Sequence, residues 1–349
     1  MSEPQTHLLV SVVIVSYNSK PWLPRCLETL QAQTLYEQTE VIFVDNISQD
    51  RSDLLAQALM KGWPRGAIVQ TGANLGFGGG ANRGAALARG KYLFFLNPDV
   101  WLEKDCLQRL VEAGEQGGYD AVGPTILDYY DDSLHSIGAS GFDIFGLPVN
   151  SRPSDPVSRL FSSGGCSFFI RRDLFQKIGQ WDERFFMYGE ELDIGWRIWI
   201  AGGIFGTAPA ARVHHRHAAV NLQGNGSVSV LHTSDSKRFH ANRNHLLTLL
   251  KSPQHFLLLL LVPAVALTLL EGLVGAAWLR RWSFFSNTSW RALASCWQMR
   301  SHWMEQRRRI KQFRRHGDFW MARFLSWRLS RWYQIRLVLK LGMPKVEQQ

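Results

Sequence analysis

Cysteine is scarce in this chain of 349 residues, and its four cysteines lie far apart. Cys26, Cys106, Cys166 and Cys296 form no C-x-x-C pair, which argues against a disulfide framework and against a cysteine-based zinc site. The N-terminus also lacks a basic region followed by a long apolar run, so no secretory signal is expected. These absences favour a protein of a reducing compartment.

Acidic residues are rare in the last fifth of the chain. Residues 280–349 contain 16 Lys/Arg against 3 Asp/Glu, whereas residues 1–279 contain 23 against 26. The net charge of +10 therefore belongs to the C-terminal tail. Such asymmetry indicates an anionic partner for the tail, either nucleic acid or an acidic membrane surface.

Strand-like and helix-like segments alternate through the first 125 residues or so. Repeated βα units of this kind predict an α/β fold with a mostly parallel central sheet and helices on both faces. The expected strands are "LLVSVVIVSYN", "EVIFVDN", "AIVQT", "KYLFFLNPD" and "DAVGPTIL".

A glycine-rich stretch, "NLGFGGGANRG", follows the third expected strand. Gly76, Gly78 and Ala81 match G-x-G-x-x-G/A, and Asp99 follows about 20 residues later, as in dinucleotide-binding enzymes. This match keeps a dinucleotide-dependent oxidoreductase open as an alternative. That fingerprint belongs to the first βα turn, however, and the first turn here is "SYNSKP", without glycine. We therefore interpret residues 74–84 as a flexible, small-residue loop near another kind of nucleotide.

Polar residues stand at the ends of three expected strands, where ligands bind in open α/β sheets. Tyr17 and Asn18 follow the first strand, Asp45 ends the second, and Asn97 and Asp99 follow the fourth. A carboxylate such as Asp99, in "LNPDV", can hold Mg²⁺ or Mn²⁺, which prefer oxygen ligands. The sequence thus predicts a binding edge that contains a candidate metal ligand.

Three acids, Glu190, Glu191 and Asp193, begin a predicted helix in "YGEELDIGWR". Acids in a first turn also complement the helix dipole, and Asp193 is spaced to pair with Arg197. Partial burial beside other acids raises the pKa of a carboxylate toward the range useful for a general base. The double Glu is the stronger candidate for that role.

Histidines cluster in "VHHRH" as His214, His215 and His217. In a strand, His215 and His217 share one face and His214 takes the other. A His–carboxylate pair is a plausible metal shell.

An apolar segment covers residues 255–279. From Phe256 it is apolar over 24 positions apart from Glu271 and glycines, which is long enough to span a bilayer. Residues 280–349 then interleave Arg and Lys with Trp, Phe and Leu, a pattern typical of basic amphipathic helices in a membrane interface.

Seven motifs in this order resemble family 2 glycosyltransferases of the GT-A fold, especially the rhamnosyltransferase-like branch. They cover roughly residues 9–250. The motifs are "VVIVSYNS", "VDNISQD", "NLGFGGGANRG", "LNPDV", "GGCSFFIRRDLF", "WDERFFMYGEELDIGWR" and "ARVHHRH".

The resemblance implies a division of the chain and a site. A GT-A domain is expected over 1–250, with a nucleotide-sugar-binding half (9–127) and an acceptor and catalytic half (128–250). A membrane-associated segment (255–279) and a basic helical tail (280–349) follow. Donor contacts are expected from Tyr17, Asn18, Asp45 (on the nucleobase), Asn74, Gly76, Asn82, Arg83 and Asn97. Acceptor contacts are expected from Gly164, Gly165, Trp181 and Tyr188.

By the same resemblance, Asp99 and His215 would hold a divalent cation, Mg²⁺ or Mn²⁺. Glu191 would be the catalytic base, with Glu190 and Asp193 as further candidates. Two departures stand out. Glu191 stands where the family has Asp, so Glu190 competes with it, and Asn97 replaces the first acid of the metal motif.

The expected activity is inverting transfer of a sugar, with rhamnose one candidate, from a nucleotide diphospho-sugar to a membrane-associated, lipid-linked or other saccharide acceptor. Cell-surface polysaccharide or glycolipid synthesis is the expected setting. Cytosolic donors and a positive tail both favour the cytoplasmic face of the inner membrane. A single span at 256–279 would separate them, so a monotopic or peripheral anchor through residues 255–349 is favoured over one transmembrane segment. The apolar segment argues against a nucleic-acid partner.

Overall fold

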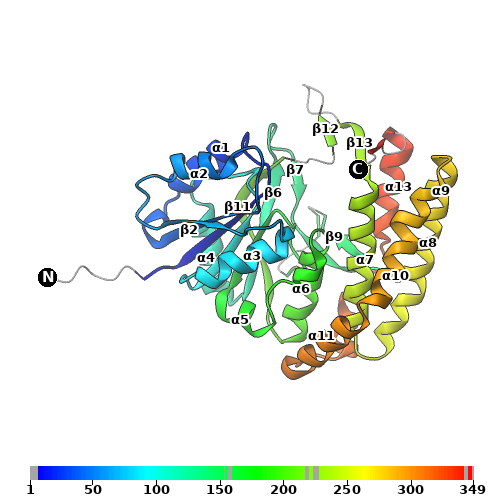
Figure 1. Ribbon diagram of the computed structural model, residues 1–349. Helices are drawn as coiled ribbons and strands as arrows, with labels where there is room; N and C mark the ends of the chain where they lie inside the picture. The colour runs from blue at the N-terminus through cyan, green and yellow to red at the C-terminus, as the bar shows by residue number, and fades with distance from the viewer. Residues whose placement is uncertain are drawn as a thin grey trace.

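The computed structural model describes residues 7–152, 154–155, 159–216, 220–222, 228–341 and 345–347. Its first part is a sheet with strand order β3-β2-β1-β4-β10-β6-β11-β5, and β7 pairs beside β6 (Figure 1). The strands are β1 (Val10–Ser16), β2 (Thr39–Asp45), β3 (Gly66–Gln70), β4 (Tyr92–Leu96), β5 (Val100–Leu102), β6 (Ala121–Asp128), β7 (Leu134–Ser136), β10 (Ser167–Arg171) and β11 (Phe205–His215).

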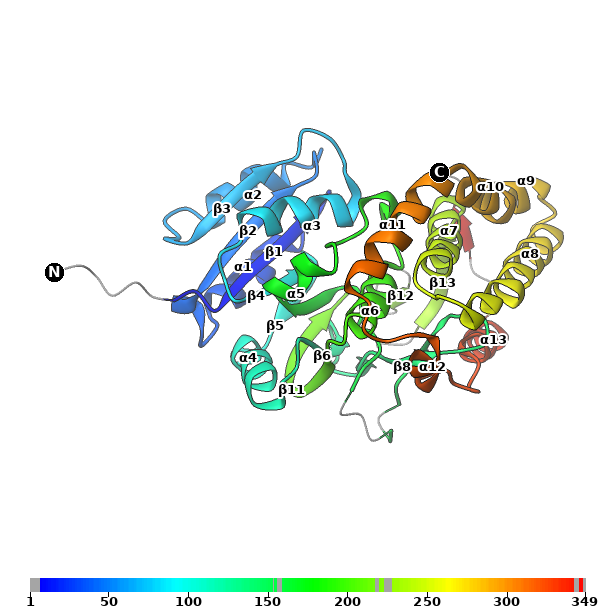
Figure 2. The same ribbon diagram turned by 90° about the horizontal axis from the view of Figure 1, so that it is seen from below.

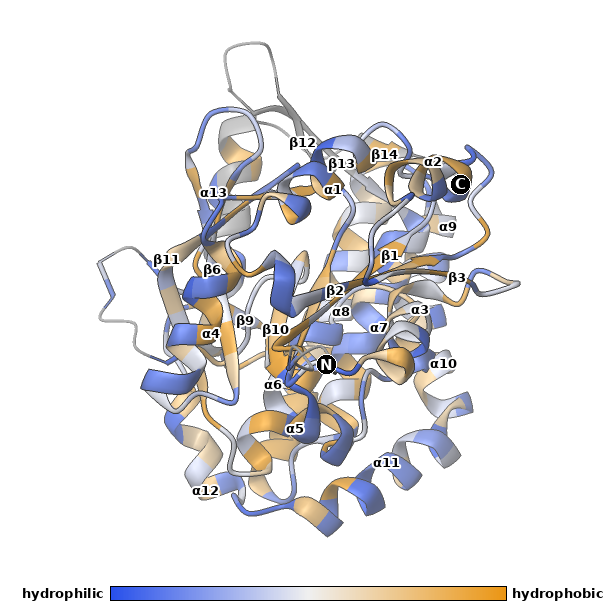
Figure 3. Ribbon diagram, turned by 90° about the vertical axis from the view of Figure 1, so that its left-hand side faces the viewer, coloured by the Kyte–Doolittle hydropathy of each residue, from blue (hydrophilic) through white to orange (hydrophobic). Residues whose placement is uncertain are grey.

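The sheet is buried on both faces because its strands are apolar at successive positions. In β1, Val13 and Val15 belong to one core cluster, while Val12 and Ile14 belong to the other. Helices α1 (Leu23–Gln31), α2 (Ser52–Leu59) and α4 (Cys106–Gly117) cover one face, and α3 (Gly76–Leu87), α5 (Arg172–Lys177) and α6 (Glu190–Ile200) cover the other. Figure 3 shows the hydrophobic strands between these helices. The predicted α/β fold class is confirmed.

Strand β10 makes the sheet a mixed one, which the sequence did not indicate. β1 pairs in parallel with β2 and β4, whereas β10 runs antiparallel between β4 and β6. The start of β10 therefore lies beside the end of β4, and the backbone N–H of Asn97 donates to the carbonyl of Cys166 at 2.9 Å. This arrangement brings the segment before β10 to the edge where the polar strand ends meet.

The glycine-rich stretch is helical, so the expectation of a flexible loop is wrong. Helix α3 begins at Gly76, and its glycines allow close packing against neighbouring elements. A Cβ on Gly84 would lie 2.4 Å from Val13 Cγ1, and a Cβ on Gly76 would lie 2.1 Å from the carbonyl oxygen of Phe186. Tight packing outweighs the low helix propensity of glycine here.

A helical unit packs beside the sheet, as Figures 1 and 2 show. It begins with α7 (Asp235–Lys251) and contains η3 (Phe256–Leu260), α8 (Leu261–Trp278), α9 (Trp282–Phe285), η4 (Ser286–Trp290), α10 (Arg291–Gln298), α11 (Arg300–Phe313), α12 (Asp318–Met321), η5 (Ala322–Phe324) and α13 (Ser330–Leu341). Short strands β8 (Ala139–Phe142), β9 (Pro148–Asn150), β12 (Val220–Leu222), β13 (Val228–Ser234) and β14 (Lys345–Glu347) form two smaller sheets. The expected helical C-terminal region is present.

Part of the tail's positive charge is used within the molecule. Arg307 donates to the carbonyls of Leu250 and Pro253 at 2.7 Å each, and Arg314 donates to Ser252 at 2.6 Å. These carbonyls lie at or just beyond the C-terminus of α7, where cationic side chains are favourable. Arg307 and Arg314 of the basic tail therefore stabilise the fold, so not all of the tail's positive charge is available to an external partner.

Candidate active site

Asp99 and His215 meet at the carboxyl edge of the sheet. Asp99 lies in the turn between β4 and β5, and His215 ends β11 opposite Val100 of β5. The Nε2 atom of His215 lies 3.6 Å from Oδ1 of Asp99. Burial raises the pKa of Asp99 to about 6, against the opposing charge of Arg216. The structure thus brings the two predicted metal ligands together.

The other histidines of the cluster differ in position. The ring of His214 stacks on Trp101 with centroids 3.5 Å apart, and its Nε2 lies 3.5 Å from the Glu103 carboxylate. His214 is therefore occupied within the fold. His217 lies outside the described residues.

A cavity of about 220 Å³ opens beside His215. Glu191, from the first turn of α6, lies in its wall together with Gly164 and Gly165, which precede β10. A Cβ on Gly165 would lie 3.4 Å from Oε2 of Glu191, and a Cβ on Gly164 would lie 2.4 Å from a methyl carbon of Ile126. The absence of side chains at these glycines leaves the space in front of the Glu191 carboxylate.

The three acids of α6 take different environments. Glu191 reaches the cavity, and burial raises the pKa of its carboxyl. Glu190 is buried outside the cavity lining, and burial together with the charges of Glu191 and Asp193 raises its pKa to about 8. Asp193 faces the core, where it forms ion pairs with Arg197 at 2.7 Å and Lys251 at 3.0 Å. Of the three candidates, Glu191 is the one that lines this cavity.

Residues of the segment between β6 and β10 also line the cavity, and sequence reasoning did not single them out. His135, Ser136 and Asn150 line it, with Ser162 and Ser163 closer to β10. The polar composition of residues 128–160 was the available signal, since irregular stretches of this length are often functional. Spacing along the chain did not show which of its side chains line the cavity.

On the donor side, Asp45 ends β2 as a buried carboxylate. Its Oδ2 accepts from the backbone N–H of Ser48 at 3.1 Å, while Oδ1 has no hydrogen-bond partner within the described residues. Tyr17 is exposed after β1, and Oδ1 of Asn18 accepts from the backbone of Gln49. These side chains share the edge that Asp99 occupies.

Asn74, Gly76 and Asn82 are engaged by the protein itself. Oδ1 of Asn74 accepts from the N–H of Gly76 at 3.0 Å, and the N–H of Phe77 donates to the carbonyl of Phe186 at 2.7 Å. Asn82 bonds the backbone of Trp181 through both its amide atoms. Two N–H groups at the start of α3 are thus occupied, which disfavours the pyrophosphate site that a dinucleotide fingerprint requires. Arg83 is exposed on α3, and Asn97 is half-buried.

Trp181 and Tyr188, both expected near the acceptor, differ in exposure. Trp181 is buried among aromatic rings, with Phe77, Phe95 and Phe168 at centroid distances of 5.1–5.3 Å. Its ring therefore serves the core and is absent from the cavity lining. Tyr188 is exposed at a positive φ of 69°, directly before the glycine that precedes α6.

The sequence of this chain is similar to known glycosyltransferases. Residues 11–179 match the family described as glycosyl transferase family 2. The N-acetylglucosaminyl-diphospho-decaprenol L-rhamnosyltransferase of Mycobacterium tuberculosis (strain CDC 1551 / Oshkosh) is 29% identical over 269 residues, covering 68% of this chain and 85% of the relative. The rhamnosyltransferase WbbL of Escherichia coli (strain K12) is 25% identical over 232 residues, covering 60% and 84%.

Two solved structures share the fold. The structure of GalNAc-T7 with UDP, GalNAc and Mn²⁺ superposes with a TM-score of 0.56 at 20% identity; the match covers 70% of this chain and about half (48%) of that one. Staphylococcus aureus TarS 1–349 in complex with UDP gives a TM-score of 0.53 at 15% identity, over 88% of this chain and 89% of that one. The GT-A-like architecture predicted from the motifs is confirmed.

Proposed function

We propose that this chain is a family 2 glycosyltransferase that transfers a deoxyhexose such as rhamnose, with inversion, from a nucleotide diphospho-sugar to a lipid-linked saccharide. One observation carries the proposal. Glu191 lines a cavity that His215 also borders, and His215 stands beside Asp99 at the carboxyl edge of the sheet. The proposed catalytic base, Glu191, and a proposed metal ligand, His215, thus line the same cavity.

The chemistry assigned to this site is a single displacement. Glu191 takes the proton of the acceptor hydroxyl as that oxygen bonds to C1 of the sugar, while the bond from C1 to the diphosphate oxygen breaks. Attack opposite the leaving group inverts C1. The burial that raises the pKa of Glu191 makes its carboxylate a better base. The proton of the acceptor therefore ends on Glu191, and the electron pair of the broken bond leaves with the nucleoside diphosphate.

Asp99 and His215 fit a divalent cation in their donor chemistry, one carboxylate oxygen and one imidazole nitrogen. Among the described residues, no group of three or more acidic, His or Cys side chains is placed to hold a metal. Diphosphate oxygens of the donor would therefore complete the shell, as is usual for Mg²⁺. When bound, the cation stabilises the charge of the departing diphosphate. The Mn²⁺ in the related GalNAc-T7 structure supports this assignment.

The donor half is proposed to use the residues at the strand ends. The unpartnered Oδ1 of Asp45 is a buried acceptor that needs a donor, and a nucleobase N–H supplies one. Tyr17 is exposed at the same edge, where a ring can cover the base. Arg83 and Asn74 stay predictions as further donor contacts.

The acceptor is proposed to be membrane-associated, because the M. tuberculosis relative is named for a diphospho-decaprenol acceptor. In the part of the chain that the structure describes, one helix is long and apolar enough to span a membrane, Phe256–Trp278. One face of α8 packs in the protein through Ala264, Thr268, Gly272, Gly275 and Ala276, whereas much of its other face is exposed.

We favour a monotopic anchor on the cytoplasmic side over a spanning helix. Helix α8 packs against α7, and α7 is tied to the catalytic unit by the buried Lys251 and Asn244. A bilayer surrounding α8 would displace α7 from this position. An exposed apolar face beside a basic tail fits the plane of a membrane interface instead.

The experiment is a transfer assay with the purified full chain, nucleotide-rhamnose and nucleotide-hexose donors, and a saccharide–diphospho-polyprenol acceptor, with and without Mn²⁺. We expect a new glycosidic bond whose anomeric configuration, read by NMR, is opposite to that of the donor. Retention of configuration would overturn the assigned mechanism. Transfer to soluble saccharides alone would overturn the assigned acceptor.

A further inference from the structure

Residues 185–189, called here the entry turn, lead directly into the first turn of α6, which carries the proposed base. Phe186 has φ 66° and ψ −58°, and the backbone N–H of Met187 donates to the carbonyl of Phe185 at 2.8 Å. These values describe a γ-turn of the rare form with positive φ, which is strained for a residue with a side chain. Tyr188 follows at φ 69°. The chain therefore enters α6 through a backbone conformation that is unfavourable on its own.

The amide of Asn244, on α7, holds the entry turn from the side of the helical unit. Its Nδ2 atom donates to the carbonyls of Phe185 at 3.0 Å, Met187 at 2.8 Å and Tyr188 at 2.7 Å. Because Nδ2 carries two protons, one of them is shared between two of these carbonyls. Asn244 is 0% exposed, so the bonds are shielded from solvent.

Arg243, the preceding residue on α7, sets the orientation of this amide. Nε of Arg243 donates to Oδ1 of Asn244 at 3.0 Å, which leaves Nδ2 to face the turn. Nη2 of Arg243 also donates to the carbonyls of Arg184 and Phe185, at 2.8 Å each. A strained backbone persists only where its surroundings fix it, and two neighbouring side chains of α7 provide such support here.

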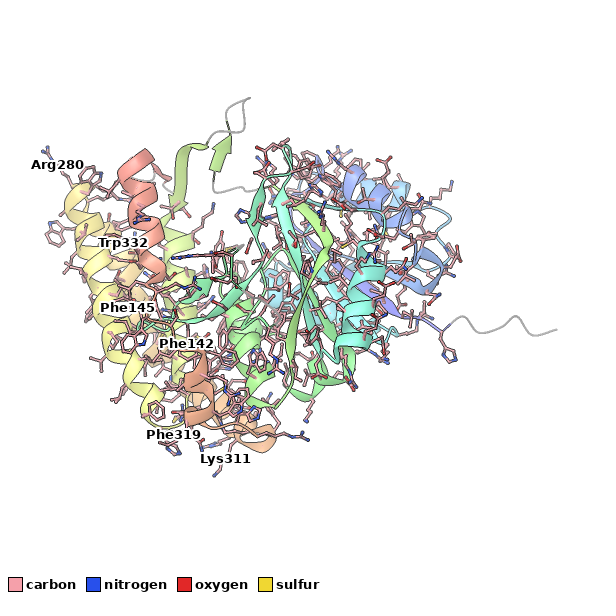
Figure 4. All side chains as sticks on the ribbon, turned by 180° about the vertical axis from the view of Figure 1, so that it is seen from behind. Phe142, Phe145, Arg280, Lys311, Phe319 and Trp332 are labelled. Atoms are coloured by element: carbon pink, nitrogen blue, oxygen red, sulfur yellow. The ribbon has the colours of Figure 1, made fainter. Side chains whose placement is uncertain are left out.

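The helical unit has further attachments to the catalytic unit besides these bonds. Figures 1 and 2 show α7 between α6 and α8. Phe142, labelled in Figure 4, stacks on Trp196 of α6 with ring centroids 4.5 Å apart. The carbonyl of Phe142 accepts from the backbone N–H of Ser326 at 2.8 Å. Loss of the Asn244 amide should therefore loosen the entry turn without separating the two units.

We propose that Asn244 is a positioning residue, which holds the entry turn in the conformation that places the Glu191 carboxylate in its cavity. Asn244 is not among the described residues that line this cavity, so it acts through the turn and not on the substrate. The helical unit is then part of the catalytic apparatus, in addition to its proposed contact with the membrane. The inference rests on the proposed role of Glu191 as the base.

Transfer kinetics and hydrogen exchange of the full chain separate positioning from overall stability. Asn244→Ala removes the amide. Asn242→Ala is the matched control, because Asn242 lies on the same helix and donates its Nδ2 to the carbonyl of Thr288, within the helical unit, at 3.3 Å. Calorimetry with the nucleoside diphosphate counts the folded sites, so that kcat is expressed per site and unfolded protein does not lower it. Hydrogen exchange is followed in a peptide that covers residues 185–193.

We expect Asn244→Ala to lower kcat per site roughly 100-fold, as is typical when a reacting group is displaced by about 1 Å, with unchanged affinity for the nucleoside diphosphate. Exchange at residues 185–193 should become faster, whereas exchange in β1 and β4 should stay as in the wild type. Asn242→Ala should match the wild type in both measurements. Asn244→Ser keeps one O–H donor and should fall between the two, and it replaces Asn244→Ala in the test if that variant does not fold.

The two measurements fail in different ways. Unchanged kcat per site in Asn244→Ala, beside an active wild type, would overturn the positioning role and leave the proposed function standing. A loss of kcat with unchanged exchange at residues 185–193 would also overturn it, since the turn would not have loosened. If the wild type transferred no sugar, the proposed function would fail, and equal exchange in Asn244→Ala and the wild type would then show that Asn244 does not hold the turn.

Discussion

The Nζ atom of Lys251 lies 3.0 Å from Oδ1 of Asp193, and both side chains are buried. Lys251 also forms an ion pair with Asp182. Oδ1 of Asp182 lies 3.0 Å from Nε2 of His302 on α11. Lys251 ends α7, whereas Asp182 and Asp193 flank the loop that leads into Glu191. This ion cluster therefore joins the helical unit to the catalytic loop.

Replacing Lys251 should destabilise the whole molecule. Lys251→Met leaves two buried carboxylates without their shared cation, and breaking a buried pair in this way typically costs about 3–5 kcal/mol. We expect that loss in the free energy of unfolding, measured by urea denaturation. Lys61→Met, at an exposed lysine, is the control and should change little. Equal stability of the two variants would show that the cluster does not join the units.

Acid should weaken the same cluster. Burial alone would raise the pKa of Asp182, but Lys251 and His302 outweigh it and hold that pKa well below its usual range. Stability from a depressed carboxyl pKa is complete above the unfolded value, about 3.9, and is lost as the pH falls below it. We expect a steep loss of stability below about pH 4, and Asp182→Asn should be less stable at neutral pH but less acid-sensitive. An unchanged acid limb in that variant would refute the assignment.

Glu191→Gln should abolish sugar transfer while donor binding survives. The amide cannot take the acceptor proton, and general base catalysis is typically worth about 10²–10⁴-fold. Turnover and calorimetric binding of the nucleoside diphosphate separate the two effects. Glu190→Gln is the matched control, since Glu190 is absent from the cavity lining. Loss of turnover in Glu190→Gln with activity kept in Glu191→Gln would move the base by one residue.

Glu190 should make the fold less stable as the pH rises. Burial and the neighbouring acids raise its pKa to about 8, whereas the unfolded chain titrates near its ordinary value of about 4.3. Between these values the folded state holds the proton and the unfolded state does not, so the free energy of unfolding falls with increasing pH. Urea denaturation at pH 5, 6.5 and 8 should show a decline that Glu190→Gln reduces. Parallel curves for the two proteins would contradict the raised pKa.

Local pattern and motif order predicted the α/β fold and the residues at its carboxyl edge, because strand ends in such a sheet share one side. The pairing of Asp99 with His215 came instead from the resemblance to family 2 glycosyltransferases, through the motifs "LNPDV" and "VHHRH". The start of helix α3 at Gly76 was missed because glycine's low helix propensity favours a loop, and close packing of these glycines against Val13 and Phe186 reverses that preference.

The cavity residues His135 and Asn150 were beyond sequence reasoning for a different reason. They lie in the hairpins that pair β7 with β6 and β8 with β9, and both pairings contain a register shift that spacing along the chain does not reveal. Trp181 shows the converse error, since an aromatic residue in a catalytic motif proved to be a core residue.

Gly165→Val should impair acceptor use more than donor binding. A β-branched side chain there would enter the space in front of Glu191, because a Cβ at this position would lie 3.4 Å from Oε2 of Glu191. We expect a higher KM for the acceptor, a lower kcat, and unchanged affinity for the nucleoside diphosphate. Gly165→Ala is the matched control and should be milder, since 3.4 Å is an ordinary contact for a methyl group. Loss of donor affinity in Gly165→Val would place Gly165 on the donor side instead.

Two exposed side chains of the helical unit test how the protein meets the membrane. Leu259 and Val262, at the start of the apolar helix, are each 69% exposed. The double change to Asp places two negative charges on this face and should weaken binding to anionic vesicles at least tenfold. The reason is that burying a charged side chain in lipid is unfavourable, by up to about 2.5–3.5 kcal/mol at the centre of the bilayer. Leu54→Asp, 51% exposed on α2, is the control and should bind as the wild type does. If the double variant bound equally well but high salt released it, the basic tail alone would hold the protein to the membrane, and the monotopic arrangement would be wrong.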